Sequence, residues 1–112
     1  MAKGHNLGEF ELLILAALMM LGEDAYGMTV YEQVKKLAVG TRSVSLGACY
    51  TTLDRLEQKG YVKSFFADPT PERGGRAKRY FEITGLGQVA MRNALKVAQN
   101  MLSGLREIGS VL

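Results

Sequence analysis

Few residues in this sequence suit metal binding, disulfide formation or catalysis. Among its 112 residues there is one cysteine, Cys49, and one histidine, His5. A single cysteine cannot close an intramolecular disulfide, and one cysteine with one histidine cannot supply the ligands of a structural zinc site. No serine or cysteine has a histidine and a carboxylate close by in sequence, and the glycine-rich segment ERGGRAK at 72–78 fits neither common phosphate-binding motif. We therefore expect no metal, no cofactor and no enzymatic activity.

Long hydrophobic segments are also absent. The longest apolar run, residues 12–21, has ten residues, about half of the roughly 20 that span a membrane as a helix. No small-residue cleavage site follows the charged start, so we expect no signal peptide. Nearly half of the residues are hydrophobic, as in a single globular domain, and the lone cysteine fits a reducing compartment. The prediction is a cytoplasmic protein without membrane association.

Positive charge is modest overall but unevenly distributed. The formal net charge is +3. Residues 42–80 hold eight lysines and arginines against four acidic residues, a balance of +4, whereas the rest of the chain sums to −1. The middle of the chain is therefore the segment that suits an acidic partner.

Capping residues and hydrophobic periodicity predict four helices and one hairpin. Asn6 and Glu9 have the spacing of a capping box, and Gly22 suits the end of the helix that follows. Asp24, Ser45 and Thr84 are suitable caps for the other three helices. The expected order is helix 7–21, helix 25–38, helix 46–59, strand 61–67, loop 68–77, strand 78–83 and a helix from about 86 to beyond 102.

The third predicted helix carries a face that could enter a DNA groove. Helical spacing directs Leu46, Cys49, Tyr50, Leu53 and Leu56 inward and leaves Ala48, Thr51, Thr52, Arg55 and Lys59 outside. Small and hydroxylated side chains followed by cations allow a close approach to base edges and phosphates in the major groove. The alternative is an ordinary solvated helix face, and this pattern alone does not exclude it.

The predicted hairpin has a basic, glycine-containing tip. Arg73, Arg76, Lys78 and Arg79 lie within seven residues around Gly74 and Gly75. Glycines allow the backbone to approach a phosphate or a minor groove, and flanking cations neutralise the phosphate charge. A loop that only increases solubility is the alternative. A candidate recognition helix followed directly by a basic hairpin is the element order of a winged helix-turn-helix.

Four segments resemble the short PadR-family transcriptional regulators. They are LGEFELLILAAL at 7–18, EDAYGMTVYEQV at 23–34, SLGACYTTLDRLEQKGYV at 45–62 and PTPERGGRAKRYFEIT at 69–84. The resemblance implies a mainly α (α+β) fold with a winged helix-turn-helix domain at 1–84 and a dimerisation helix at 85–112. It further implies a repressor that binds a near-palindromic operator, with Tyr26, Gly27 and Tyr50 near the DNA. The expected DNA contacts are Tyr26, Gly27, Arg42, Ser45, Ala48, Tyr50, Thr51, Thr52, Arg55, Lys59, Arg73, Gly74, Gly75, Arg76, Lys78 and Arg79.

The last predicted helix carries two adjacent apolar stripes. One is Ala90, Ala94, Val97, Met101, Leu105, Ile108 and Leu112, and the other is Met91, Leu95, Ala98 and Leu102. Two stripes suit two partners, one in the same chain and one in a second copy, and such a dimer would set two recognition helices about 34 Å apart. The expected dimer contacts are Leu12, Leu15, Met19, Ala90, Ala94, Val97, Met101 and Leu105. Packing on the chain's own core alone is the alternative.

Other functions remain open from the sequence. Several relatives sense small hydrophobic molecules in the dimer cavity, and Met19, Met20, Met91 and Met101 could line such a pocket or simply fill a core. The chain has no tryptophan, so the aromatic sandwich of some multidrug-sensing relatives is not assumed here. A winged-helix module that binds protein instead of DNA, and a small-molecule carrier, are the competing hypotheses.

Overall fold

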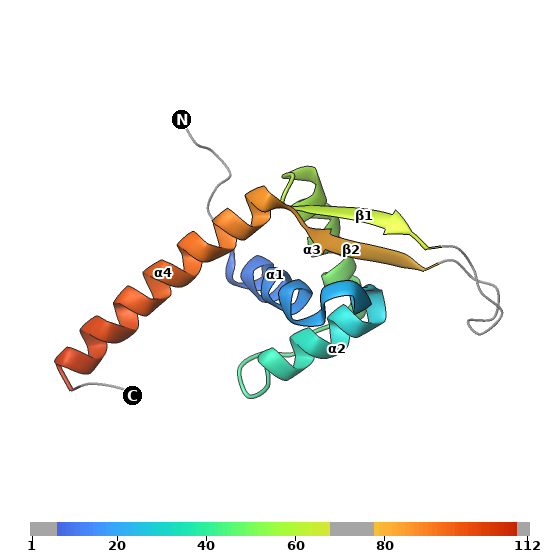
Figure 1. Cartoon of the computed structure of the whole chain (residues 1–112). Coiled ribbons are helices and arrows are strands. Elements are labelled where there is room, and N and C mark those ends of the chain that lie inside the picture. The colour runs from blue at the N-terminus through green and yellow to red at the C-terminus, as the bar shows by residue number, and fades with distance from the viewer. Residues whose placement is uncertain (1–6, 68–77, 110–112) are drawn as a thin grey trace.

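Three short helices, a two-stranded hairpin and a long last helix make up the computed structural model, which describes residues 7–67 and 78–109. The elements are α1 (Glu9–Leu21), the 3₁₀ turn η1 (Gly22–Asp24), α2 (Gly27–Leu37), α3 (Leu46–Gln58), β1 (Val62–Phe66), β2 (Arg79–Ile83) and α4 (Gly85–Glu107). Helices α1 to α3 cluster together, the hairpin projects from one side, and α4 runs away on the other (Figure 1). This is the predicted mainly helical winged-helix arrangement.

The hydrophobic core lies where α1, α2, α3 and the root of the hairpin meet. Its members are Ile14, Leu15, Ala17, Leu18, Ala25, Val30, Val34, Cys49, Leu53, Leu56, Tyr61, Val62 and Phe81. Cys49 is buried, and burial raises the pKa of its thiol, so it acts as a small hydrophobic residue. Helix α1 is apolar nearly all round because α2, α3, β2 and α4 contact different sides of it.

The first two helices begin later than predicted. Helix α1 is capped at Gly8, whose N–H donates to Glu11 Oε1 over 2.9 Å, and Asn6 lies outside the described residues. Asp24 does not cap α2, because the chain first forms the 3₁₀ turn at 22–24. Tyr26 occupies the cap position instead, and its N–H donates to Thr29 Oγ1 over 2.9 Å.

The caps of the other two helices are confirmed. Ser45 Oγ accepts from the Ala48 N–H over 3.1 Å, and Thr84 Oγ1 accepts from the Gly87 N–H over 3.1 Å. Both residues have the extended backbone of a helix cap. The start of α3 therefore has a side chain that stabilises its otherwise unpaired N–H groups.

The hairpin is tied to the helices along one edge. Strands β1 and β2 pair antiparallel from Val62 opposite Ile83 to Phe66 opposite Arg79. On the other edge of β2, the Phe81 N–H donates to the Ala25 carbonyl over 2.9 Å, and Tyr26 and Tyr80 form an isolated bridge. The strands are slightly shorter than predicted, and the predicted loop 68–77 lies outside the described residues.

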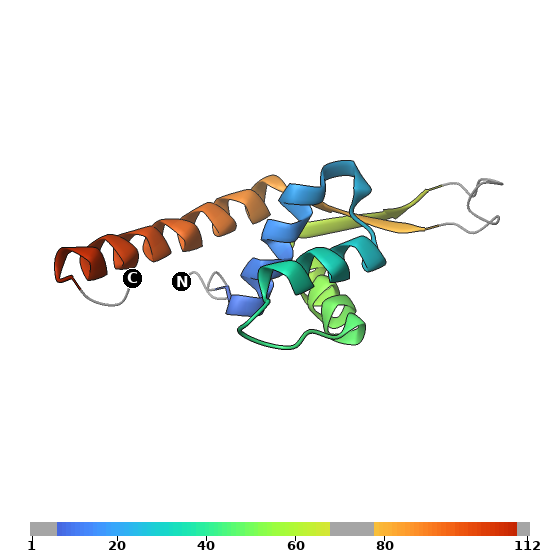
Figure 2. The ribbon, with the colours of Figure 1, turned by 90° about the horizontal axis from the view of Figure 1, so that it is seen from below.

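Helix α4 is anchored only at its beginning. A Cβ at Gly87 would overlap the Tyr61 carbonyl oxygen, so the helix starts in very close contact with the backbone before β1. Ala90 and Met91 pack against the core, whereas the rest of α4 extends away from the three-helix cluster (Figures 1 and 2). Leu95, Val97, Met101, Leu102 and Ile108 are exposed. The predicted apolar stripes are thus uncovered over most of their length.

Leu15 does not fit the predicted dimer contact. It is fully buried and belongs to the hydrophobic core of its own protomer. Met19 is exposed at the end of α1, and Leu12 is partly exposed.

Across residues 7–67 and 78–109, no helix combines the length and apolar character that a membrane crossing requires.

Candidate nucleic-acid interface

The exposed face of α3 is small near its start and polar along its length. Ala48, Thr51 and Arg55 are exposed, as predicted. Gly47, Asp54 and Gln58 share this face and were missed by the sequence prediction. The signal was available, since residues 47, 51, 54 and 58 repeat at helical spacing opposite the buried stripe of Cys49, Leu53 and Leu56.

Thr52 was predicted on this face, and that placement is wrong. Its side chain is 4% exposed. Thr52 lies three residues after Cys49 and four before Leu56, so it belongs to the buried stripe. It cannot contact DNA without leaving the core.

Tyr50 lies at the edge of α3 rather than in the core. It is 39% exposed, and Leu46 is also exposed, so the predicted inward direction is wrong for both residues. The Tyr50 hydroxyl packs so closely on Gly27 that a Cβ at residue 27 would overlap it. Gly27 therefore lets α3 and the start of α2 approach each other.

An aromatic cluster joins the start of α2 to the loop-side end of the hairpin. The rings of Tyr26 and Tyr80 meet edge to face with centroids 5.4 Å apart, and Lys78 Nζ lies 4.4 Å from the centre of the Tyr26 ring. Tyr50 reaches the same helix start through Gly27. The structure therefore brings together four predicted DNA-contact residues from three elements: Tyr26, Gly27, Tyr50 and Lys78.

Lys59 is held by a buried carboxylate. Its Nζ lies 2.8 Å from Glu11 Oε2, and the side chains are 27% and 7% exposed respectively. Burial would raise the pKa of Glu11, but hydrogen bonds from Lys59 and the Gly8 N–H, together with the positive charges of Lys59 and Arg55, outweigh it and lower the pKa below its ordinary value. The ammonium group is therefore directed to α1 and away from the surface on which it was predicted.

Arg79 is likewise engaged within the protein. Its Nη2 lies 2.7 Å from Glu57 Oε1 and 3.4 Å from Asp54 Oδ1, and its guanidinium stacks over the Phe81 ring. Glu57 Oε2 also accepts from Ser64 Oγ over 2.9 Å. These bonds fix the middle of β1 and the loop-side end of β2 to α3, so Arg79 is a structural link between the hairpin and that helix.

The remaining predicted DNA-contact residues lie in different environments or outside the described residues. Arg42 lies 3.6 Å from Glu9 and 4.8 Å from the centre of the Phe10 ring, in an exposed position. Ser45 uses its hydroxyl to cap α3. Arg73, Gly74, Gly75 and Arg76 lie outside the described residues. On α3, within the part of the chain that the structure describes, Arg55 makes no ion pair.

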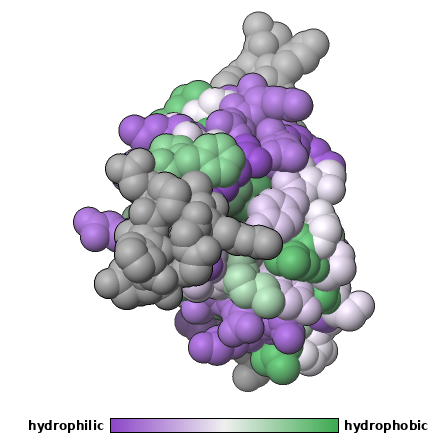
Figure 3. Space-filling view, turned by 90° about the vertical axis from the view of Figure 1, so that its right-hand side faces the viewer, coloured by the Kyte–Doolittle hydropathy of each residue, from purple (hydrophilic) through white to green (hydrophobic). Residues whose placement is uncertain are grey.

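The side from which the hairpin projects is chemically mixed. Figure 3 shows hydrophilic groups interspersed with hydrophobic patches on this side. Strand β1 contributes two exposed aromatic rings, Phe65 and Phe66. The described residues show no group of three or more histidine, cysteine or acidic side chains that could hold a metal ion.

The sequence profile of the "Transcriptional regulator PadR-like family" matches residues 14–93, from α1 to the first third of α4. The chain belongs to the PadR-like family of transcriptional regulators. Members of this family regulate transcription and are not enzymes. Among proteins with curated functions, no match was found.

Solved PadR structures share the fold of this chain. The PadR family transcription regulator from Clostridium difficile R20291 has a TM-score of 0.73 at 19% identity, covering 92% of this chain and 100% of that one. The PadR-like regulator from Bacillus cereus strain ATCC 14579 has a TM-score of 0.68 at 21% identity, covering 92% and 93%. The fold is also similar to that of the Bordetella bronchiseptica protein BpsR, with a TM-score of 0.64 at 13% identity, covering 92% of this chain and 67% of that one.

In this PadR-like regulator the predicted contact residues fall into groups with different physical roles. Ala48, Thr51 and Arg55 remain on an open helix face. Lys59 and Arg79 are held by acidic partners, and Thr52 is in the core. The candidate interface therefore contains fewer residues than the sequence predicted. It consists of the outer face of α3 and the adjacent start of α2, where Tyr26 and Tyr50 lie.

Proposed function

We propose that this PadR-family regulator binds double-stranded DNA with the outer face of α3 in the major groove. The observation that supports this most directly is the open face of Gly47, Ala48, Thr51 and Arg55. Small side chains at the start of the helix let its backbone approach the bases, and Thr and Arg can bond base edges or phosphates. The Ser45 cap supports a rigid first turn.

The hairpin is the second contact in this proposal. The Arg79–Glu57 and Ser64–Glu57 bonds hold the two strands of the hairpin on α3, so the two elements meet the DNA in a fixed relation. Lys78 and Tyr26 lie beside the loop-side end of the strands and can contact the phosphate backbone. Arg73 and Arg76, in the segment outside the described residues, would add contacts from the loop.

The proposal includes a homodimer formed through α4. Val97, Met101 and Ile108 are exposed on a helix that extends away from the core, and a continuous apolar face of this kind favours burial against a second copy. A two-fold dimer presents two α3 helices to a near-palindromic operator. Repression follows if the operator overlaps a promoter. BpsR, whose DNA binding is described as regulated by 6-hydroxynicotinic acid, supports adding relief by a small ligand to the proposal.

The DNA contact can be tested by fluorescence anisotropy with the DNA upstream of the chain's own coding region. Arg55→Ala should weaken binding by roughly 5- to 100-fold and Thr51→Ala should change sequence preference, because a base or phosphate contact is worth about 1–3 kcal/mol. Lys36→Ala, which removes the same charge from the far end of α2, is the matched control. Unchanged affinity in both α3 variants would contradict the assignment of this face. No binding at low salt, with a protein partner recovered instead, would favour the protein-interaction alternative.

The dimer can be tested separately by sedimentation velocity. Val97→Glu and Met101→Glu place a charge on the exposed α4 face, so each should give a folded monomer with far weaker operator binding. Arg92→Glu on the polar face of α4 is the control and should remain dimeric. A wild-type protein that sediments as a monomer at high concentration would contradict this part of the proposal.

A further inference from the structure

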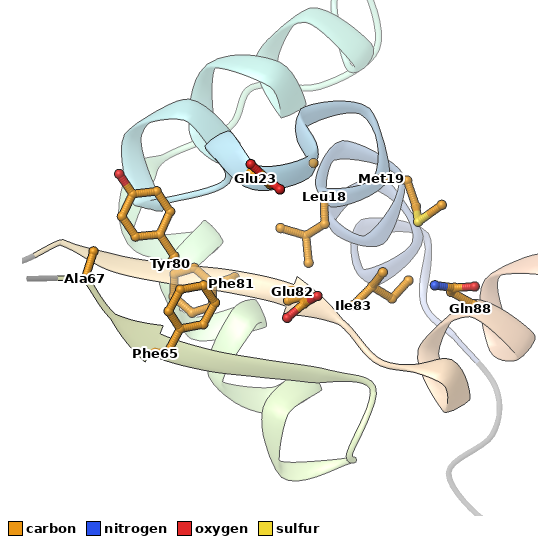
Figure 4. Close-up of a pocket in the computed structure, with 11 residues that line it drawn as sticks. Leu18, Met19, Glu23, Phe65, Ala67, Tyr80, Phe81, Glu82, Ile83 and Gln88 are labelled. Carbon is orange, nitrogen blue, oxygen red and sulfur yellow. The ribbon is translucent and has the colours of Figure 1, made fainter.

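A hollow separate from the α3 face lies along the hairpin, between the strands and the end of α1. Its volume is about 690 Å³, and it is bounded by the end of α1, η1, both strands and the first turn of α4. In Figure 4, Met19 and Gln88 lie toward one end, Phe65 and Tyr80 toward the other, and Leu18 and Ile83 between them. This volume is in the range of small-molecule sites.

The lining of this hollow is largely apolar and aromatic. Leu18 and Phe81 are core residues whose surfaces form part of its wall. Phe65 is 50% exposed at the rim, and its ring stacks on that of Tyr80 with centroids 6.0 Å apart and an interplanar angle of 18°. A ligand with a flat or bulky apolar body can therefore bury surface against several side chains at once.

The charged groups of the lining are both carboxylates. Glu23 comes from η1 and Glu82 from β2, and Figure 4 shows them on opposite sides of the hollow. No lysine or arginine is among the lining residues. Glu82 has only an exposed partner, Lys63, at 3.6 Å, and within the described part of the chain Glu23 has no ion pair. Exposed pairs of this kind are weak, so both carboxylates remain open to a ligand.

We propose that this hollow, between Glu23 of η1 and Glu82 of β2, binds organic cations that have an apolar or aromatic body. The carboxylates would hold the positive charge, and the Phe65 face would contact the body and add cation–π attraction. The site is built within one protomer, so it does not depend on the α4 dimer proposed above. Selectivity for cations would be unusual for a chain with a net charge of +3 and would point to this local lining.

The charge preference can be tested with two ions of matched shape. Tetraphenylphosphonium and tetraphenylborate have nearly the same size and opposite charge. In equilibrium dialysis with the full chain, we expect the phosphonium to bind at least about tenfold more tightly than the borate. The double variant Glu23→Gln, Glu82→Gln should weaken phosphonium binding by about three- to tenfold. Glu32→Gln, on the exposed face of α2, should leave it unchanged.

The place of binding can be tested by fluorescence, because the chain has no tryptophan. Phe65→Trp puts a single fluorophore at the rim of the hollow, and Phe66→Trp puts one on the opposite face of the same strand. Phosphonium should change the emission of the first variant and not of the second. Borate binding as tightly as phosphonium, unchanged affinity in the double Gln variant, or an equal response from both tryptophans would overturn the proposal. These readouts need no DNA, so failure here is distinguishable from failure of the DNA proposal.

Discussion

Lys59→Met should destabilise the protein while leaving its phosphate contacts unchanged. Lys59 Nζ lies 2.8 Å from Glu11 Oε2, and the Glu11 side chain is 7% exposed. Removing one partner of a fully buried ion pair costs about 3–5 kcal/mol, because the other charge stays buried without compensation. Lys59 itself is 27% exposed, so water can partly replace it, and we expect a loss of about 2–3 kcal/mol.

A double variant separates the cost of the unpaired Glu11 charge from the cost of lost Lys59 side-chain packing. In the double variant Glu11→Gln, Lys59→Met, no charge is left buried, and the Gln carbonyl can still accept from the Gly8 N–H. We expect the double variant to be more stable than Lys59→Met alone by about 1 kcal/mol or more. Urea unfolding followed by circular dichroism measures both differences, at one protein concentration because a dimer's stability depends on it.

The same pair predicts a dependence on pH with a definite sign. Although burial acts to raise the pKa of Glu11, its hydrogen bonds and the positive charges of Lys59 and Arg55 hold the pKa below the ordinary value. The folded state therefore favours the ionised form, and the stabilisation is fully present above the ordinary glutamate pKa. It is lost as the pH falls through the lowered value. Wild type should lose more stability than Glu11→Gln from about pH 5 downward. Equal losses would show that the pair contributes nothing.

The salt dependence of DNA binding tests whether Lys59 contacts a DNA phosphate. If Lys59 stays on Glu11, the slope of log affinity against log salt concentration should be the same in wild type and in folded Lys59→Met. Arg55→Ala should make the slope shallower by about one for each phosphate that the variant no longer neutralises. A Lys59→Met protein of wild-type stability with a shallower slope would refute the structural role and restore Lys59 to the DNA surface.

Further predictions concern the packing and capping of the helices. Gly87→Ala should cost about 1–3 kcal/mol of unfolding free energy, because the new Cβ would overlap the Tyr61 carbonyl oxygen. Gly104→Ala, at a position in α4 with open space around it, should raise the unfolding free energy by up to about 1 kcal/mol. If urea unfolding showed Gly87→Ala to be more stable than Gly104→Ala, the described packing of α4 would be contradicted. Ser45→Ala should cost about 0.5–2 kcal/mol through loss of the bond to the Ala48 N–H, whereas Ser45→Asp should retain most of the stability.

The sequence predicted best the features that depend on neighbouring residues. The Ser45 and Thr84 caps and the bounds of α3 were correct because the cap, the apolar spacing and the final Gly60 lie within one segment. The start of α2 was wrong because Asp24 is also a good cap in isolation. The 3₁₀ turn at 22–24 moves the cap to Tyr26 and the helix start to Gly27, and that turn packs on β2, far away in sequence.

The candidate site was harder to predict because cations look alike in a sequence. The partner of Lys59 is 48 residues away, and the carboxylate bonded to Arg79 is 22 residues away. Nothing local distinguishes them from Arg55, which stays exposed. The Thr52 placement was a different kind of error, because its spacing from Cys49 and Leu56 already indicated burial. The hollow near Phe65 combines several elements and has no sequence signature.

These ion pairs also limit how strongly DNA binding can depend on salt. Of the eight cations between residues 42 and 80, Arg42, Lys59, Lys63 and Arg79 are in ion pairs among the described residues. The other four are Arg55, Lys78, Arg73 and Arg76, the last two outside the described residues. The exposed pairs of Arg42 and Lys63 are weak and can open, so a dimer that uses every one of these cations except Lys59 and Arg79 contacts at most about twelve phosphates. That gives a salt slope of about −11, whereas all eight cations per protomer would give about −14. A measured slope near the steeper value would mean that the paired cations leave their carboxylates on binding, and the fixed link between α3 and the hairpin would then have to be abandoned.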